Sequence, residues 1–389
     1  MTFRHSFEPE QNQVLVEMEA GMLKMTLNRP RHLNSLTHQM VSQLKNTLQE
    51  HEFDPKLKLV LIKGNGKAFC VGGDVTRLIQ VILAGFYFYT WNWSYSGLFY
   101  RKQLMLDYLV SIYNKPLVFF VNGAVMGGGA GLCLNGTFRV VTEKTVFAMP
   151  EVSIGLFPDV GVSYFLSRLP GHLGEFLGLT GTKLDGADML FVGLASHFVP
   201  SKDLEQLESE LRIAASNGTQ LIAEVINKFA KVPNLKTSSP CNRIETINNC
   251  FSRNTVEQIL FSLENEGANN EDKWIAKAID SIKLASPTSL KLTLKIIRES
   301  RSKTLKECLA RDYLMAMHFG VGTVNDDFLE GARAKFFQRD TKPKWNPSKL
   351  EEVTDEMIEQ FCSQICDEDW VEMKLPDECV SKRRRNSKL

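Results

Sequence analysis

Residues 116–132 read PLVFFVNGAVMGGGAGL, and the architecture of the chain follows from this run. Its first part, Pro116 to Asn122, is continuously apolar, which is typical of a parallel strand that is covered on both faces. Three glycines at 127–129 come next and lead into a helical pattern. Because one or two glycines suffice for a turn, three in succession indicate that another group approaches the backbone closely. We therefore predict a strand, a tight glycine turn and a helix.

The same order of strand, turn and helix recurs on both sides of this run. Thr37 is suited to cap a helix whose apolar positions Met40, Val41, Leu44 and Leu48 share one face. Repetition of this order predicts an α/β fold with mainly parallel strands. Further strands are predicted at Met22–Asn28, Leu57–Lys63, Phe138–Val141 and Val146–Met149.

Strand patterns end near residue 202, and helical periodicity dominates from Asp203 through Leu350. Within that part, Lys231–Arg243 contains two prolines and three serine or threonine residues, which is typical of a linker. We predict a core at 14–202, a helical C-terminal region at 203–350 and a C-terminal extension at 351–389.

Composition excludes several classes of protein. The 389 residues are 43% hydrophobic and 23% charged, as in ordinary globular proteins. With 46 Lys plus Arg against 45 Asp plus Glu, the net charge of +1 gives no electrostatic case for binding nucleic acid or a membrane surface. Eight cysteines without a Cys-x-x-Cys pair argue against a disulfide scaffold and against structural zinc, so no metal site is expected. No signal peptide or membrane helix is expected either.

The chain ends in Ser387-Lys388-Leu389, a tripeptide that peroxisomal import receptors recognise. It follows a basic run, residues 382–385, which also fits a solvated tail. The two interpretations are compatible, because a receptor needs an exposed end. We therefore predict a peroxisomal location, with the import receptor as a partner.

Two acids, Glu151 and Asp159, lie in a largely apolar segment at residues 149–161. Burial in such surroundings raises the pKa of a carboxyl group, which suits a general base or a nucleophile. The alternative is structural: Asp159 caps a turn and Glu151 pairs with Arg139 or Arg168.

The two glycine turns and an aromatic-rich segment each allow two interpretations. The backbone N–H groups of the glycine turns at 71–74 and 126–129 are able to stabilise an oxyanion, or the glycines serve tight packing alone. Nine aromatic residues between Phe86 and Tyr100 fit a core helix or buried loop, or an apolar lid over an acyl chain.

Several motifs together resemble one known family. The chain resembles the crotonase (enoyl-CoA hydratase/isomerase) superfamily over residues 14–350, and within it the 3-hydroxyisobutyryl-CoA hydrolase branch of the peroxisomal type. This resemblance implies repeated ββα units that form a superhelical core, with a helical C-terminal region. The superfamily blocks are Asn28-Arg29-Pro30, Leu33–Leu36, Lys67–Asp74, Asn122-Gly123 with Met126–Gly129, and Phe147–Glu151. The branch blocks are Ile154–Gly161, Ser286–Lys291 and Asp327–Ala334.

The resemblance also implies a function, which is hydrolysis of a short-chain 3-hydroxyacyl-CoA thioester, foremost 3-hydroxyisobutyryl-CoA in valine catabolism. By motif match, the N–H groups of Gly73 and Gly128 bind the thioester oxygen. Glu151 activates water or attacks the thioester carbon, and both routes stay open. Asp159 holds the 3-hydroxyl group or positions the water. No cofactor is implied, because coenzyme A is part of the substrate. A homo-oligomer is left open.

Three departures bear on this function. Hydratases of the superfamily use a second glutamate at the position of Gly131, so we expect hydration by two carboxylates to be disabled here, as in the hydrolase branch. The branch often has a substrate-contacting glutamate where this chain has Gln103, and glycines where it has Val162-Ser163. Two alternatives therefore remain, which are an enoyl-CoA hydratase or isomerase and a non-catalytic acyl-CoA-binding or assembly protein.

Overall fold

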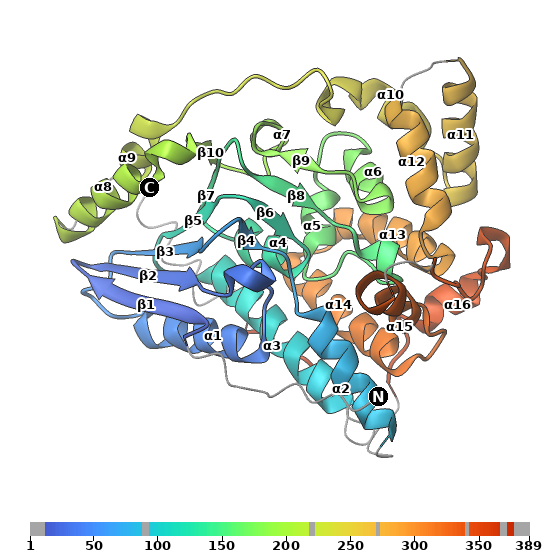
Figure 1. The fold of residues 1–389 in the computed structure, drawn as a ribbon, viewed down its shortest axis with the longest axis horizontal. Coiled ribbons are helices and arrows are strands. Elements are labelled where there is room, and N and C mark those ends of the chain that lie inside the picture. The colour runs from blue at the N-terminus through green and yellow to red at the C-terminus, as the bar shows by residue number, and fades with distance from the viewer. Residues whose placement is uncertain are drawn as a thin grey trace.

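The computed structural model describes residues 12–87, 93–217, 222–269, 273–338, 342–365 and 372–376. The expected α/β fold is confirmed: two sheets built mainly from parallel strands lie within residues 14–198, and helices predominate in the described chain after them (Figure 1). Within these ranges, no helix combines the length and the apolar composition that crossing a membrane requires.

The larger sheet has six strands in the order β1-β2-β3-β5-β7-β10. Only the β1–β2 pair is antiparallel. The strands are β1 (Val14–Glu19), β2 (Met22–Leu27), β3 (Leu59–Gly64), β5 (Leu117–Val121), β7 (Phe138–Val141) and β10 (His197–Phe198).

The smaller sheet has four strands in the order β4-β6-β8-β9, of which β8 and β9 pair antiparallel. They are β4 (Ala68–Cys70), β6 (Ala124–Met126), β8 (Val146–Ala148) and β9 (Leu184–Asp185). In each repeat, one strand joins the larger sheet and the next joins the smaller sheet before the chain enters a helix. The repeats are β3–β4, β5–β6 and β7–β8. The two sheets are therefore products of one ββ-helix unit repeated along the chain.

The central strands β3 and β5 of the larger sheet are buried on both faces, which explains their continuous apolar runs. Along β3 and β5, Val60 and Phe119 face the main core, whereas Leu61 and Val118 face a second cluster that helices α8 and α9 complete. Thr37 caps α1 as predicted, because its side chain accepts a hydrogen bond from the N–H of Met40.

Helices dominate the second half of the described chain. Helix α14 packs along α3, and an irregular segment after α9 crosses the molecule to reach α10 (Figure 1). The helices in the N-terminal half are α1 (His38–His51), α2 (Val75–Tyr87), α3 (Trp93–Ile112), α4 (Gly128–Leu134), α5 (Val162–Leu166), α6 (Leu173–Thr180) and α7 (Gly186–Phe191). Those that follow are α8 (Leu204–Ser216), α9 (Ile222–Phe229), α10 (Ile244–Phe251), α11 (Val256–Asn269), α12 (Lys273–Leu284), α13 (Pro287–Glu299), α14 (Leu305–Val321), α15 (Asp327–Ala332) and α16 (Asp355–Gln360).

The glycine triplet lies where the two sheets meet helix α4. A Cβ atom on Gly129 would lie 2.2 Å from the carbonyl oxygen of Cys70, at the end of β4. The backbone of β4 cannot retreat, because it pairs with β6 in the smaller sheet. The close approach expected from the triplet is therefore that of one backbone segment to another.

Replacing Gly129 with alanine should destabilise the fold, because its Cβ would collide with backbone and not with a flexible side chain. We expect a loss of about 1–3 kcal/mol or more in the free energy of unfolding, measured by urea titration. The matched control is Gly267→Ala in α11, where the nearest atom is the side-chain Cγ2 of Ile275 at 3.2 Å. That variant should be unchanged or slightly stabilised. Equal stability of the Gly129→Ala variant and the wild type would contradict this account.

Candidate active site

A cavity of about 690 Å³ is lined by both glycine turns, by helix α3 and by the chain that follows β8. All five residues predicted as site residues line this cavity, and they come from five different segments. They are Gly73 after β4, Gln103 on α3, Gly128 at the start of α4, Glu151 in the short helix η2 (Glu151–Ile154), and Asp159 in the loop before α5.

The two glycine turns lie against each other at this cavity. The N–H of Leu36 donates a hydrogen bond to the carbonyl of Gly72, and the carbonyl of Leu36 accepts one from the N–H of Asp74. Because N–H groups alternate in direction along an extended chain, the N–H of Gly73 faces away from Leu36. Gly128 is the first residue of α4, and its N–H has no acceptor within the helix. A Cβ on Gly72 would lie 3.0 Å from the nitrogen of Gly128. Two N–H groups on adjacent turns are the arrangement that an oxyanion hole requires.

Two polar side chains flank the Gly127-Gly128 turn. A Cβ on Gly127 would lie 2.9 Å from Oε1 of Glu151, and one on Gly128 would lie 2.2 Å from Nε2 of Gln103. Gln103 is buried, and its Nε2 has no hydrogen-bond partner among the residues that the structure describes. A carboxyl group and an unused amide donor therefore lie against the backbone of this turn.

The two predicted acids are both buried, at 5% and 6% exposure. Burial and the charge of Asp159 raise the pKa of Glu151 well above its usual range. Burial and the charge of Asp312 raise the pKa of Asp159 to about 7, while a hydrogen bond from the Tyr100 hydroxyl opposes that rise. Raised pKa values in two neighbouring buried acids are typical of groups that take up and release protons in catalysis.

The proposed pairing of Glu151 with an arginine is wrong. Arg139 donates to the carbonyl groups of Gly136 and Leu194, and Arg168 donates to those of Tyr164 and Ser300. The structural reason is that both guanidinium groups are taken up by carbonyls at loop and helix ends, away from the cavity.

Comparison with known proteins identifies the family. The model of the enoyl-CoA hydratase/isomerase family matches residues 22–362. The chain belongs to this family. The carnitinyl-CoA dehydratase of Mycobacterium thermoresistibile has a similar structure, with a TM-score of 0.81 at 32% identity over 93% of this chain and 98% of that one. The crotonase-like fold expected from the motifs is thereby confirmed.

Two curated relatives show what this enoyl-CoA hydratase/isomerase family includes. The chain is 46% identical to 3-hydroxyisobutyryl-CoA hydrolase 1 of Arabidopsis thaliana over 94% of this chain and 95% of that one. It is also 40% identical to small ribosomal subunit protein mS47 of the same plant, over 94% of this chain and 88% of the relative. The family therefore contains proteins named for hydrolysis and for assembly into a ribosome.

The predicted peroxisomal location is wrong by these comparisons. The human and chicken 3-hydroxyisobutyryl-CoA hydrolases are named mitochondrial, as is the hydrolase-like protein 1 of Arabidopsis thaliana. The prediction depended on the three residues Ser387 to Leu389, which lie outside the described residues. The expected import receptor depended on the same tripeptide and loses its support with it.

Gly131, where the resemblance implies a glutamate in hydratases, lies directly against Val160. A Cβ at Gly131 would lie 2.6 Å from the Cβ of Val160 and 3.0 Å from its carbonyl oxygen. Val160 has a φ angle of +56°, which is strained for a β-branched residue. The space that a glutamate at position 131 would need is therefore occupied by the residue next to Asp159.

The aromatic segment is only partly described. Residues 88–92, and the side chains of residues 82–96, lie outside what the structure describes, so the predicted lid stays untested there. Phe99 and Tyr100, at its end, are buried and line the cavity. Sequence reasoning noted Tyr100 only as one aromatic residue among nine and missed its hydrogen bond to Asp159.

Sequence reasoning also missed Asp107, one helical turn after Gln103 on α3. Its carboxyl group is fully buried, and neither oxygen has a hydrogen-bond partner among the described residues. Burial, with a smaller contribution from the charge of Asp159, raises its pKa well above the usual range. No group of three His, Cys, Asp or Glu side chains in the described part of the chain is arranged to hold a metal ion.

Replacing Asp107 with asparagine should change how stability depends on pH. In the wild type, the unfolded chain loses the Asp107 proton near pH 4, whereas the folded chain retains it to a higher pH. The unfolded state thus binds fewer protons in this window, and stability falls as pH rises. Asparagine removes this loss, so Asp107→Asn should gain stability relative to wild type as pH rises from 4 to 8, measured by urea titration. The exposed Asp280→Asn is the control, and parallel pH curves for wild type and Asp107→Asn would contradict the prediction.

Proposed function

We propose that the chain hydrolyses the thioester of a short 3-hydroxyacyl-CoA, with 3-hydroxyisobutyryl-CoA as the principal substrate, in the breakdown of valine. The observation that carries this proposal is the pair of buried acids, Glu151 and Asp159, beside two glycine turns in one cavity. The names of relatives at 40–46% identity over most of the chain support the same reaction.

The proposed mechanism begins with the thioester oxygen between the N–H groups of Gly73 and Gly128. These groups stabilise the negative charge that develops on that oxygen, and losing one such donor typically costs about 100- to 1000-fold in rate. Glu151 then either takes a proton from the attacking water or attacks the thioester carbon itself, and the second route gives an anhydride that water hydrolyses. Coenzyme A leaves as a thiolate, which is a good leaving group because a thiol pKa is about 8.5.

The remaining groups of the site would select the acyl chain. The Asp159–Tyr100 pair and the unused Nε2 of Gln103 are able to hydrogen-bond a 3-hydroxyl group. Arg31, Lys183 and Lys335 line the same cavity and carry charges that suit the phosphates of coenzyme A. In this mechanism no cofactor is needed beyond the coenzyme A of the substrate.

Two alternatives have less support. Hydration by two carboxylates lacks its second acid, and Val160 occupies the space at Gly131. A non-catalytic binding or assembly role, such as the name mS47 indicates for one relative, leaves the burial of Glu151 unexplained. Its Oε2 has no hydrogen-bond partner among the described residues, and burying such a polar atom costs stability.

The Glu151→Gln variant distinguishes these functions, because it keeps the shape of the side chain and removes the carboxylate. We expect thiol release from 3-hydroxyisobutyryl-CoA to fall at least 1000-fold while coenzyme A binding, measured by calorimetry, persists. The wild-type panel should include 3-hydroxypropionyl-, 3-hydroxybutyryl-, acetyl- and crotonyl-CoA. Absence of thiol release from every 3-hydroxyacyl-CoA would refute the proposed function. Unchanged turnover in Glu151→Gln would refute only the role of Glu151.

Variants of Gln103 test the selection of the 3-hydroxyl group. Gln103→Met removes both hydrogen-bonding groups at similar volume, so the preference for 3-hydroxyisobutyryl-CoA over isobutyryl-CoA should fall about tenfold in kcat/KM. Gln103→Glu can still accept a hydrogen bond from the hydroxyl and should retain the preference. An unchanged preference in Gln103→Met would show that Gln103 does not contact the 3-hydroxyl group.

A further inference from the structure

A carboxyl group from the helical C-terminal region reaches the loop that bears Asp159. Asp312 on α14 is fully buried, and its Oδ2 accepts a hydrogen bond from the N–H of Gly161 at 2.7 Å. The two residues are 151 positions apart in the chain, so this contact ties the second half of the molecule to the site. It is not part of the chemistry proposed above, because Asp312 does not line the cavity.

The loop needs an external anchor because its backbone is strained. Val160 has φ +56° and Gly161 has φ +72°, so two consecutive residues adopt the left-handed conformation. For a β-branched residue this conformation is strained and persists only when the surroundings enforce it. The Gly161 N–H bond to Asp312 is a contact from outside the loop that does so.

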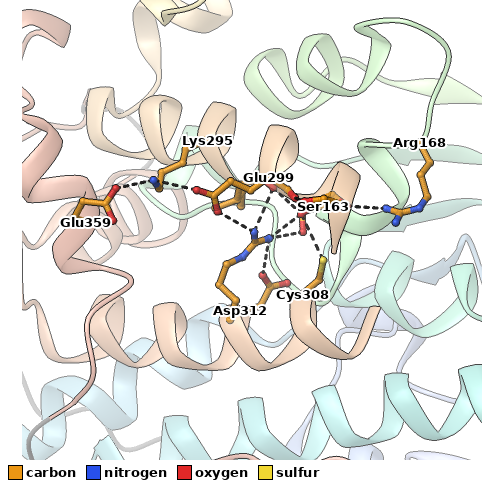
Figure 2. A network of polar contacts seen from close by, with 11 residues as sticks. Ser163, Arg168, Lys295, Glu299, Cys308, Asp312 and Glu359 are labelled. Carbon is orange, nitrogen blue, oxygen red and sulfur yellow. Dashed lines mark hydrogen bonds and ion pairs between the residues drawn. The ribbon is translucent and has the colours of Figure 1, made fainter. Parts of the chain in front are cut away.

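Asp312 itself is held by a buried polar network (Figure 2). Its neighbour Arg311 donates from Nη2 to Ser163 Oγ at 2.9 Å and to Ser300 Oγ at 3.0 Å. Nη1 of Arg311 lies 3.6 Å from Glu299, which in turn pairs with Lys295. The guanidinium is therefore shared among several acceptors and lies 3.7 Å from Oδ1 of Asp312, which has no hydrogen-bond partner among the described residues.

We propose that Asp312 is a positioning residue for Asp159. Its bond to Gly161 fixes the strained turn after Asp159, and its charge favours the protonated form of the Asp159 carboxyl group. The inference rests on the proposed function, in which Asp159 contacts the 3-hydroxyl group or the water. Asp312 acts through the backbone and through its field, without contacting substrate.

The electrostatic part of this role follows from the groups that face Asp159. Asp312 on α14 raises the pKa of Asp159, and the Tyr100 hydroxyl on α3 lowers it. Glu151 in η2 and Asp107 on α3 also lie within the influence of Asp159. Burial raises the pKa of Asp312 itself to about 6, against the opposing charge of Arg311 and the Gly161 bond. The ionised form of Asp312 therefore opposes ionisation of Asp159.

Ser163 connects this network to a departure seen in the sequence. Where the hydrolase branch favours glycine, the buried Ser163 hydroxyl accepts a bond from Arg311 in this chain. This bond links Arg311 to α5 at a position two residues after Gly161. Relative to a glycine, this serine gives the network a second attachment to the same loop and helix.

The test separates the two parts of the proposal. Asp312→Asn retains a side-chain oxygen for the Gly161 N–H but removes the charge, so the Asp159 midpoint should fall by about 0.5–1 pH unit. This is measured by carbon NMR of the side-chain carboxyl groups in the substrate-free protein, with Asp159→Asn to assign the signal. Asp312→Ala removes the anchor, and kcat for 3-hydroxyisobutyryl-CoA should fall at least tenfold with KM changed less than threefold.

Asp188→Asn is the matched control. Asp188 is a similarly buried acid on α7, its carboxyl group accepts a hydrogen bond from the Ser239 hydroxyl, and it does not line the cavity. It should lower the melting temperature without moving the Asp159 midpoint. An unmoved midpoint in Asp312→Asn, or an unchanged kcat in Asp312→Ala, would overturn the proposal. Because the NMR titration needs no turnover, a chain that hydrolyses no acyl-CoA would refute the proposed function and still report on Asp312.

Discussion

The structure depends on the close approach of the glycine triplet to the backbone at the end of β4. Gly129 lies against the Cys70 carbonyl at a distance that excludes a side chain, and Gly128 lies against the side-chain amide of Gln103. This approach brings the turn after β4 and the start of α4 together at one cavity. The same approach joins the repeated units, since β4 and β6 pair in the smaller sheet directly before it. The packing of α4 against β4 and the candidate oxyanion hole therefore depend on the same contact between the glycine triplet and β4.

The helical C-terminal region supports the acids of the site from behind. A Cβ on Gly155 would lie 2.2 Å from the carbonyl oxygen of Asp327, and one on Gly331 would lie 2.4 Å from the carbonyl carbon of Ile154. Asp327 is held in turn by the Ser286 hydroxyl at 2.6 Å, so two of the C-terminal sequence motifs meet beneath η2. Burying Glu151 costs free energy, and tight backbone packing on the far side of η2 is one way in which the fold holds it there.

Much of this arrangement could be predicted from the sequence, because its signals are local. Apolar and alternating patterns located β2, β3, β5, β7 and β8, and Thr37 located a helix start. The strand β1 was not predicted, because most of its residues are exposed and show no buried face. The strands β4, β6, β9 and β10 were also missed, since each has only two or three residues. Tyr100, Asp107 and Asp312 could not be recognised, since each acquires its role from partners on distant segments. The predicted peroxisomal location was wrong because it was based only on the last three residues. The domain boundaries at 202 and 350 stay a prediction.

The contact between Gly131 and Val160 bears on how one fold serves two reactions. A hydratase needs a carboxylate at position 131, and that side chain requires the space in which Val160 now lies. Val160 occupies it because residues 160 and 161 turn through left-handed conformations, which directs Asp159 toward Tyr100 and the cavity. The absence of an acid at position 131 and the placement of Asp159 are thus coupled, because Val160 occupies the space that a side chain at position 131 would need. Within this family, the proposed hydrolytic site therefore excludes two-glutamate hydration by packing as well as by composition.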